Sequence, residues 1–221
     1  MRTHISARHG RLGGTVFALM LLLASSGLFA QALYDAFIRA VTTDDVSAVR
    51  AMLARGMDPN TVDPNGEPVL VVAARAGWEP TLDALLAAGA KVDAANPFGD
   101  RPIMVAALSG HLAIVQKLFR RGAALDRPGW TPLIYAATNG NDEVVRYLLD
   151  AGAAIDAAAP NGTTALMMAV RGGHAATVDL LLGRGADINH RNDSGATALS
   201  WARREGFEAI EATLRRRGAK G

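Results

Sequence analysis

The sequence predicts an all-α repeat protein, a solenoid of about six helix–turn–helix units joined by β-turn or hairpin loops. Two glycine series carry this prediction. The first, usually followed by alanine, recurs at intervals of 33, 33, 30, 33 and 33 residues, at Gly56, Gly89, Gly122, Gly152, Gly185 and Gly218. The second has the same period and the same irregularity, at Gly77, Gly110, Gly140, Gly173 and Gly206. Between the glycines, apolar residues recur at helical spacing. Such a period indicates units that cannot bury their apolar faces alone and therefore stack.

The chain begins with a pattern typical of a secretory signal peptide, residues 1–32. Three arginines precede an apolar run at residues 16–24, and small residues follow, ending in Ala30-Gln31-Ala32. A basic head, a short apolar centre and an A-x-A end define a cleavable signal, so we predict cleavage after Ala32. The alternative is an uncleaved membrane anchor over residues 15–32, which has 18 residues interrupted by polar ones and lies at the lower limit of a span.

Composition restricts the classes of function. The whole chain has a net charge of +2, but the three charged residues of the signal segment are all basic, which leaves 20 basic and 21 acidic side chains afterwards. Nucleic-acid binding requires a basic face, so we expect no nucleic-acid partner. The chain has no cysteine, which excludes disulfides, thiolate metal sites and a cysteine nucleophile. We expect a bacterial periplasmic protein, with an inner-membrane anchored form as the alternative.

Each predicted unit opens with a short apolar helix. Five such helices are expected, at residues 70–74, 103–107, 133–137, 166–169 and 199–202. They share an alanine at one fixed position, namely Ala73, Ala106, Ala136, Ala169 and Ala202. A small side chain at that position lets neighbouring helices approach closely.

A longer amphipathic helix follows the second-series glycine of each unit. Its apolar residues lie at helical spacing, as at Ile114, Val115, Leu118 and Phe119. We expect each of these helices to end at the first-series glycine, because glycine adopts the left-handed conformation that ends a helix at little steric cost. A turn-rich segment follows, such as PNG at residues 64–66.

These features together resemble the ankyrin repeat. The fourth unit carries the clearest match: TPLIYAA at residues 131–137, Gly140, VV at 144–145, LL at 148–149 and GA at 152–153. The resemblance covers residues 33–221, in units of about 33–65, 66–98, 99–128, 129–161, 162–194 and 195–221. It implies the fold directly and says much less about function.

The sequence also departs from the family pattern. The family's usual histidine after Thr-Pro-Leu is replaced by Ile38, Val71, Met104, Ile134, Met167 and Ser200. Where present, that histidine ties neighbouring turns by hydrogen bonds, so mostly apolar packing must substitute for it. The loop between Asp126 and Thr131 is three residues shorter than its counterparts, which predicts a clipped or missing hairpin finger. In the terminal units, Asp44 replaces a glycine, and Glu211 and Arg215 replace apolar residues, as suits polar capping repeats.

Residues with chemical potential mostly follow the repeat. His111 and His174 occupy one repeat position, which Asn141 fills in the intervening unit, and His190 lies in a turn, where we expect it to be solvated. A recurring acid or amide after the first-series glycine is expected to stabilise its turn; it is Asp93, Asp126, Asp156 and Asn189. Without a nucleophile–base motif, we expect no enzyme, metal or cofactor. The weak alternative is a site assembled across repeats from His111, Asp142 or His174.

Stacked repeats present a continuous concave surface, and the resemblance places partner contacts beside the turn glycine and at the end of each first helix. Carried over unit by unit, these positions are Asn65, Glu67, Arg75, Phe98, Asp100, Leu108, Trp130, Thr138, Asn139, Asn161, Thr163, Arg171, Ser194 and Arg204. Phe98 and Trp130 stand out, because large exposed aromatics favour binding, although Trp130 could instead fill the space left by the short finger. Basic residues near the C-terminus, at 203–204 and 215–217, are attributed to the helix dipole; the alternative is a patch for an anionic lipid or an acidic partner.

The expected function is therefore that of a non-catalytic protein–protein interaction module exported to the periplasm. It would be a monomer that binds an unidentified protein through its concave face and turn tips. Membrane contact would arise only if the signal segment stayed uncleaved. The protein would then act as a membrane-anchored tether or a protective accessory of an envelope enzyme.

Overall fold

The computed structural model describes residues 29–220, and the predicted all-α solenoid is confirmed there. A helix covers residues 29–42. It is followed by α2 (Val46–Ala54), α3 (Val69–Ala76), α4 (Glu79–Ala87), α5 (Pro102–Ser109), α6 (Leu112–Arg120), α7 (Pro132–Thr138), α8 (Asp142–Asp150), α9 (Ala165–Arg171), α10 (Ala175–Gly183), α11 (Ala198–Glu205) and α12 (Glu208–Arg216). Within these residues, β-structure is limited to one antiparallel bridge between Val62 and Pro68.

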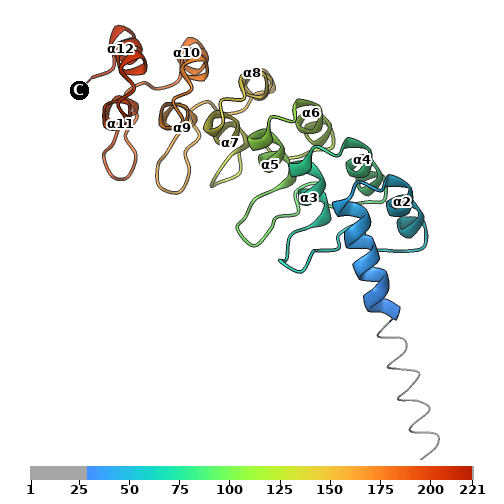
Figure 1. Ribbon diagram of the computed structural model, residues 1–221. Coiled ribbons are helices and arrows are strands. Elements are labelled where there is room, and N and C mark those ends of the chain that lie inside the picture. Colours follow the sequence, from blue (N-terminus) through green and yellow to red (C-terminus); the bar gives the residue numbers. More distant parts are fainter. Residues whose placement is uncertain (1–28, 221) are drawn as a thin grey trace, which may run out of the picture.

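The helix pairs stack into a bent, two-layered array (Figure 1). One layer contains α3, α5, α7, α9 and α11, each packed on the next, and the other contains the even-numbered helices. The loops that connect successive pairs project as fingers beyond the odd-numbered helices, on the inside of the bend. This arrangement places the loop ends and the first helices of each pair on one concave face.

The core consists of the same positions in successive units. The predicted close-contact alanines are all fully buried, at 0% exposure: Ala73, Ala106, Ala136, Ala169 and Ala202. So are the leucines that recur in the second helices, Leu85, Leu118, Leu148, Leu181 and Leu214. Since each of these side chains is covered by the adjoining unit, stability is a sum over neighbouring interfaces.

Apolar packing does replace the missing family histidine in the inner units. Val71, Met104, Ile134 and Met167 occupy its position and are at most 3% exposed. In the last unit, the hydroxyl of Ser200 instead accepts a 2.9 Å hydrogen bond from the backbone N–H of Thr197. Thr197 in turn accepts from the backbone N–H of Ser200, which closes a capping box at the start of α11.

Histidines at a different repeat position, directly after the second-series glycine, form hydrogen bonds between neighbouring units. Nε2–H of His111 donates to the carbonyl of Arg75 over 3.1 Å, and that of His174 donates to the carbonyl of Thr138 over 3.0 Å. Asn141 makes the equivalent bond in the intervening unit, where its side-chain amide donates to the carbonyl of Leu108 over 2.8 Å. The expectation of a structural repeat position is confirmed.

His190 is wrongly predicted to be solvated. Its ring is partly buried, and Nε2 lies 2.8 Å from the carbonyl oxygen of Gly162. Because a carbonyl oxygen can only accept, Nε2 carries the proton. His190 therefore ties the last finger to the finger before it.

The recurring loop acids and amides act between units, which corrects their predicted role inside a single turn. Each accepts a backbone N–H from the next loop, as Asp126 does from Ala154 over 3.0 Å and Asp156 does from Asp187 over 2.9 Å. The acceptors are Asn60, Asp93, Asp126, Asp156 and Asn189. They form a ladder of hydrogen bonds that fixes the stacking of the loops.

The ends of the solenoid have the polar character expected of caps. Asp44 adopts a positive φ of 54° where later units have glycine, and its carboxylate accepts a 2.6 Å hydrogen bond from Thr81 of the second unit. In the last unit, Glu211 accepts from both Arg203 and Arg215. These ion pairs cover the outer side of the last unit.

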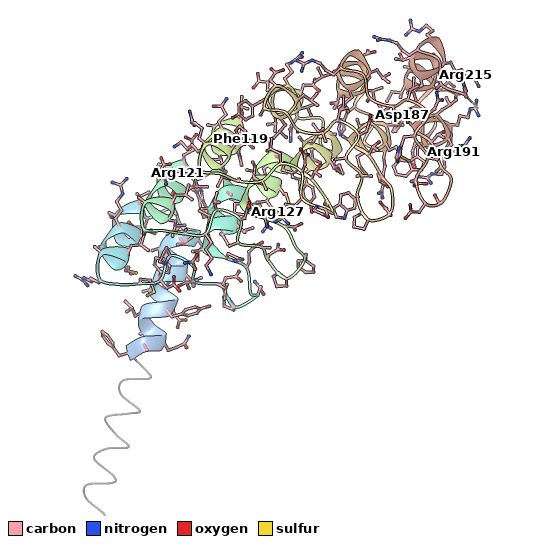
Figure 2. The ribbon with its side chains drawn as sticks, turned by 180° about the vertical axis from the view of Figure 1, so that it is seen from behind. Phe119, Arg121, Arg127, Asp187, Arg191 and Arg215 are labelled. Atoms are coloured by element: carbon pink, nitrogen blue, oxygen red, sulfur yellow. The ribbon has the colours of Figure 1, made fainter. Side chains whose placement is uncertain are left out.

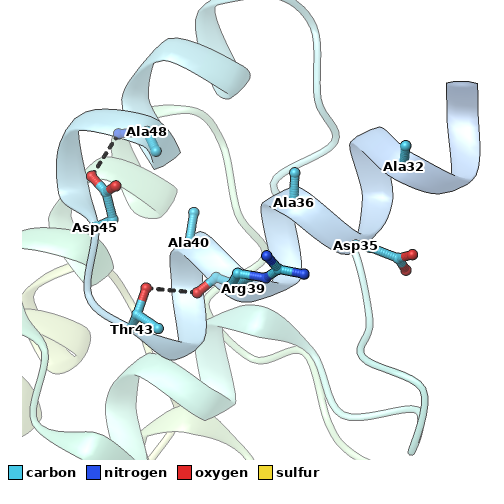
Figure 3. Close-up of a pocket in the computed structure, with 8 residues that line it drawn as sticks. All are labelled: Ala32, Asp35, Ala36, Arg39, Ala40, Thr43, Asp45 and Ala48. Carbon is cyan, nitrogen blue, oxygen red and sulfur yellow. Dashed lines mark hydrogen bonds between the residues drawn. The ribbon is translucent and has the colours of Figure 1, made fainter.

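The N-terminal segment is described only from residue 29. Residues 1–28 of the predicted signal lie outside the described part, and the predicted cleavage point after Ala32 lies within the helix of residues 29–42. This helix packs beside α2, where Asp45 accepts a 3.0 Å hydrogen bond from the backbone N–H of Ala48 (Figure 3). Over residues 29–220, no helix has the length and apolar character required to cross a membrane.

Candidate partner-binding surface

The predicted contact residues fall into three groups along the concave face. Finger tips carry Asn65, Phe98, Asn161 and Ser194; finger exits carry Glu67, Asp100, Trp130 and Thr163; the ends of the first helices carry Arg75, Leu108, Thr138, Asn139, Arg171 and Arg204. Thirteen of these side chains are exposed or partly exposed. The structure thus places them on one face, but it brings only some of them into contact.

Thr163 is the exception, because its side chain is only 1% exposed. It occupies the position that has Glu67, Asp100 and Trp130 in earlier units, but its short side chain stays below the surface. Its hydroxyl has no hydrogen-bond partner among the described residues. A partner could not reach this side chain without a rearrangement, so we leave Thr163 out of the surface proposed below.

A polar network joins the second, third and fourth units. Arg75 forms two 2.5 Å hydrogen bonds with the carboxylate of Glu67. Asn96 donates to Glu67 over 3.1 Å and to Asp100 over 3.3 Å. The hydroxyl of Tyr135 donates to the other oxygen of Asp100. The network therefore runs without interruption across the N-terminal half of the face.

Sequence reasoning missed Asn96 and Tyr135 in this network. Asn96 also accepts the backbone N–H groups of Phe98 and Asp100, as Asp63 does for Asn65 in the finger before. The recurrence of an acid or amide directly before the turn at the finger tip was the available signal for Asn96. Tyr135 carries no such signal, because its partner belongs to another unit.

The network sets the charge of this half of the face. The hydrogen bonds that Arg75 donates to Glu67 raise the pKa of Arg75 above its usual value, and the nearby carboxylates of Asp100 and Asp63 act in the same direction. Burial raises the pKa of Tyr135, and the hydrogen bond to Asp100 raises it further, because a phenolate would face a carboxylate. Arg75 is thus already balanced by acids of its own chain.

Tyr135 is expected to make the protein less stable at alkaline pH. In the unfolded chain this hydroxyl ionises near its ordinary pKa of 10.0, whereas in the folded chain it stays protonated. Stability should therefore fall as the pH rises above that value. The free energy of unfolding, measured with urea, should fall less between about pH 9 and about pH 11 in Tyr135→Phe than in the wild type. Tyr147→Phe is the control and should lose as much as the wild type. Equal losses in Tyr135→Phe and the wild type would contradict this assignment.

An apolar pocket lies next to the network, at the shortened loop. Leu108 at the end of α5, Trp130 from the loop, Tyr135 and Thr138 from α7 and Met168 from α9 enclose about 240 Å³. In the other fingers, a backbone hydrogen bond closes the loop across four residues, as from the N–H of Asn96 to the carbonyl of Asp100. Residues 126–131 form no such backbone hydrogen bond with one another, so the predicted clipped finger is confirmed.

Trp130 combines the two roles considered for it. Its ring lies edge-on to Tyr135, with 6.1 Å between ring centroids and an interplanar angle of 87°, yet 38% of the residue is exposed. It therefore packs in the space of the missing finger and also forms an open wall of the pocket. Phe98, at the tip of the preceding finger, is 89% exposed.

Comparison with protein-family models matches overlapping segments to the model described as ankyrin repeats (3 copies), at residues 37–128, 70–159, 123–192 and 155–220. The chain belongs to the ankyrin repeat family. No curated protein matches the chain. Ankyrin repeats are generally protein–protein interaction modules, and the family is typically non-catalytic.

The residues of the weak catalytic alternative have structural partners in this ankyrin array. His111 and His174 bond backbone carbonyls of the preceding units, and Asp142 accepts a 2.6 Å hydrogen bond from the hydroxyl of Thr177. None of the three lines the pocket at the shortened loop. Among residues 29–220, no cluster of three or more histidine or acidic side chains is placed to hold a metal ion.

Proposed function

We propose that this chain is a non-catalytic interaction module that is exported across the cytoplasmic membrane and binds a protein through its concave face and turn tips. The observation that carries the proposal is the pocket at the shortened loop, with the partly exposed Trp130 as its wall. A half-exposed tryptophan beside an apolar pocket has the character of an interface anchor. The strongly exposed Phe98 on the adjacent finger supports the same surface.

The proposed export rests on residues 1–32, with their basic head, short apolar run and A-x-A end. A retained segment would make the protein a membrane-anchored tether or a protective accessory of an envelope enzyme. The uninterrupted helix of residues 29–42 would then connect the anchor directly to the first repeat. N-terminal sequencing separates the two forms, because a mature chain that begins at Leu33 excludes the anchor.

The binding proposal is tested by crosslinking and pull-down of the full chain from the native envelope fraction. Trp130→Ala should weaken capture of the dominant partner by about 2 kcal/mol or more, as truncation of an interface anchor does. Arg146→Ala is the matched control, because Arg146 is exposed on α8, away from the concave face. If Trp130→Ala and Arg171→Ala leave every captured partner bound, the concave face is not the binding surface.

A further inference from the structure

The two halves of the concave face carry opposite charge. At the finger exits, the units have in order Glu67, Asp100, Trp130, Thr163 and Ala196, and at the ends of the first helices they have Arg75, Leu108, Thr138, Arg171 and Arg204. Carboxylates thus occupy the finger exits of the second and third units only. Arginines without a finger-exit acid follow in the fifth and sixth units.

Arg75 and Arg171 hold the same repeat position in different electrostatic settings. Glu67 binds Arg75 through two hydrogen bonds, and Asp100 and Asp63 also act on it. Arg171 is exposed and forms no ion pair with any of the described residues 29–220. Its positive charge is therefore available to a partner, whereas that of Arg75 is not.

Further arginines extend this basic half. Arg204 pairs with the adjacent Glu205 over 2.8 Å, and its guanidinium lies 5.5 Å from the ring centroid of Trp201. Arg191 on the last finger (Figure 2) donates to the carbonyl of Gly195 and not to a carboxylate. At the ends of the first helices and on the last finger of these two units, the arginines Arg171, Arg191 and Arg204 therefore lie near two acids, Glu205 and the exposed Asp193.

The pocket lies at the boundary between the two halves. Met168 forms one of its walls, and Arg171 follows Met168 by three residues on α9, which places both on one side of that helix. Thr138 of the pocket has the same repeat position as Arg171 on the adjoining helix α7. A side chain in the pocket would therefore have the basic units on its C-terminal side.

The size of the pocket favours a single side chain as its occupant. Its volume of about 240 Å³ is below the range of about 300–1,000 Å³ that is usual for small-molecule sites. Leucine, methionine and two aromatic side chains form most of its wall. This lining suits a leucine, methionine or phenylalanine side chain of a protein partner.

We propose that the concave face recognises a protein segment in which one bulky apolar residue has acidic residues on one side of it. The apolar side chain occupies the pocket beside Trp130, and the carboxylates lie over Arg171 and Arg204. Acids on the other side of the apolar residue would face Glu67 and Asp100 and be repelled. This inference rests on the proposed function and adds the chemistry of the partner.

The pocket can be observed directly through Met168. The full chain, labelled with ¹³C at its methionine methyl groups, is titrated with the capped peptides Phe-Gly-Glu-Glu-Glu, Phe-Gly-Lys-Lys-Lys and Ala-Gly-Glu-Glu-Glu. Met168→Leu assigns the Met168 signal. The acidic phenylalanine peptide should shift this signal with an affinity at least about fivefold above that of either other peptide. Its preference over the lysine peptide should shrink when salt rises from about 0.05 M to about 0.5 M.

A charge reversal tests the assignment to Arg171. Arg171→Glu should abolish or invert the preference for the acidic over the lysine peptide, whereas Arg146→Glu on α8 should leave it unchanged. Equal binding of both charged peptides, no effect of Arg171→Glu, or no Met168 shift with the acidic peptide at millimolar concentration would overturn the inference. Loss of partner capture in Trp130→Ala alongside any of these results would leave the proposed function standing and overturn only this further inference.

Discussion

Removal of the last unit, residues 195–221, is expected to convert the protein into an aggregating species. In the intact chain, α11 packs on α9 and α12 packs on α10. Their loss would uncover the fifth unit, whose Leu166, Val170 and Leu181 are at most 1% exposed in the whole structure. The ion pairs of Glu211 with Arg203 and Arg215 would go with it. An exposed apolar end without a polar cap promotes association.

The matched control removes an internal unit in register. Deletion of residues 162–194 joins Asn161 to Gly195 and keeps both caps. Helix α7 would then meet α11, and the buried alanines Ala136 and Ala202 preserve the close contact between them. We expect this variant to stay soluble and monomeric by light scattering, with reduced stability. Equal insolubility of both deletions would show that the array does not behave as a sum of interchangeable units.

The period of the sequence was sufficient to predict the solenoid. Helix positions follow from local features, since glycine ends each helix and apolar spacing defines its buried side. The change from 33 to 30 residues at one place also located the clipped finger correctly. Even the substitution of glycine by Asp44 marked a true left-handed position, with φ of 54°.

Contacts between units could not be read from the period. A recurring Asp126 or Asp156 looks the same in sequence whether it accepts a hydrogen bond from its own turn or from the next loop. Only the distance between the stacked loops decides which N–H group the carboxylate reaches. The same limit explains His190, whose acceptor Gly162 lies 28 residues earlier, and the buried position of Thr163. Contacts between residues about one repeat apart depend on how the units are rotated against one another.

The positions of the candidate surface residues were predictable, but whether their charges are paired within the chain was not. The sequence placed Arg75 and Arg171 at equivalent sites, and they look alike there. The structure separates them, because the finger exit before Arg75 is Glu67, whereas the one before Arg171 is the buried Thr163. The pocket likewise needed Tyr135 and Met168, which the family positions do not include.

Leu148→Ala is expected to have the largest effect of any single substitution considered, a loss of about 2–5 kcal/mol in the free energy of unfolding. Leu148 is fully buried on α8, and α8 contacts both α6 and α10. A cavity there weakens two interfaces in the middle of the array. Urea unfolding followed by circular dichroism should show a lower midpoint for the whole molecule.

The same truncation in the last unit should behave differently. Leu214 has the repeat position of Leu148 and is equally buried, but α12 has a neighbour, α10, on one side only. Leu214→Ala should therefore release the last unit at low urea while units two to four keep their stability, because a terminal interface can open without breaking the others. Hydrogen exchange should locate the early loss in residues 198–216 for Leu214→Ala and across the centre for Leu148→Ala. A single transition with the same loss in both variants would mean that the six units fold as one cooperative block, and the stability of the partner-binding face would then depend on every repeat equally.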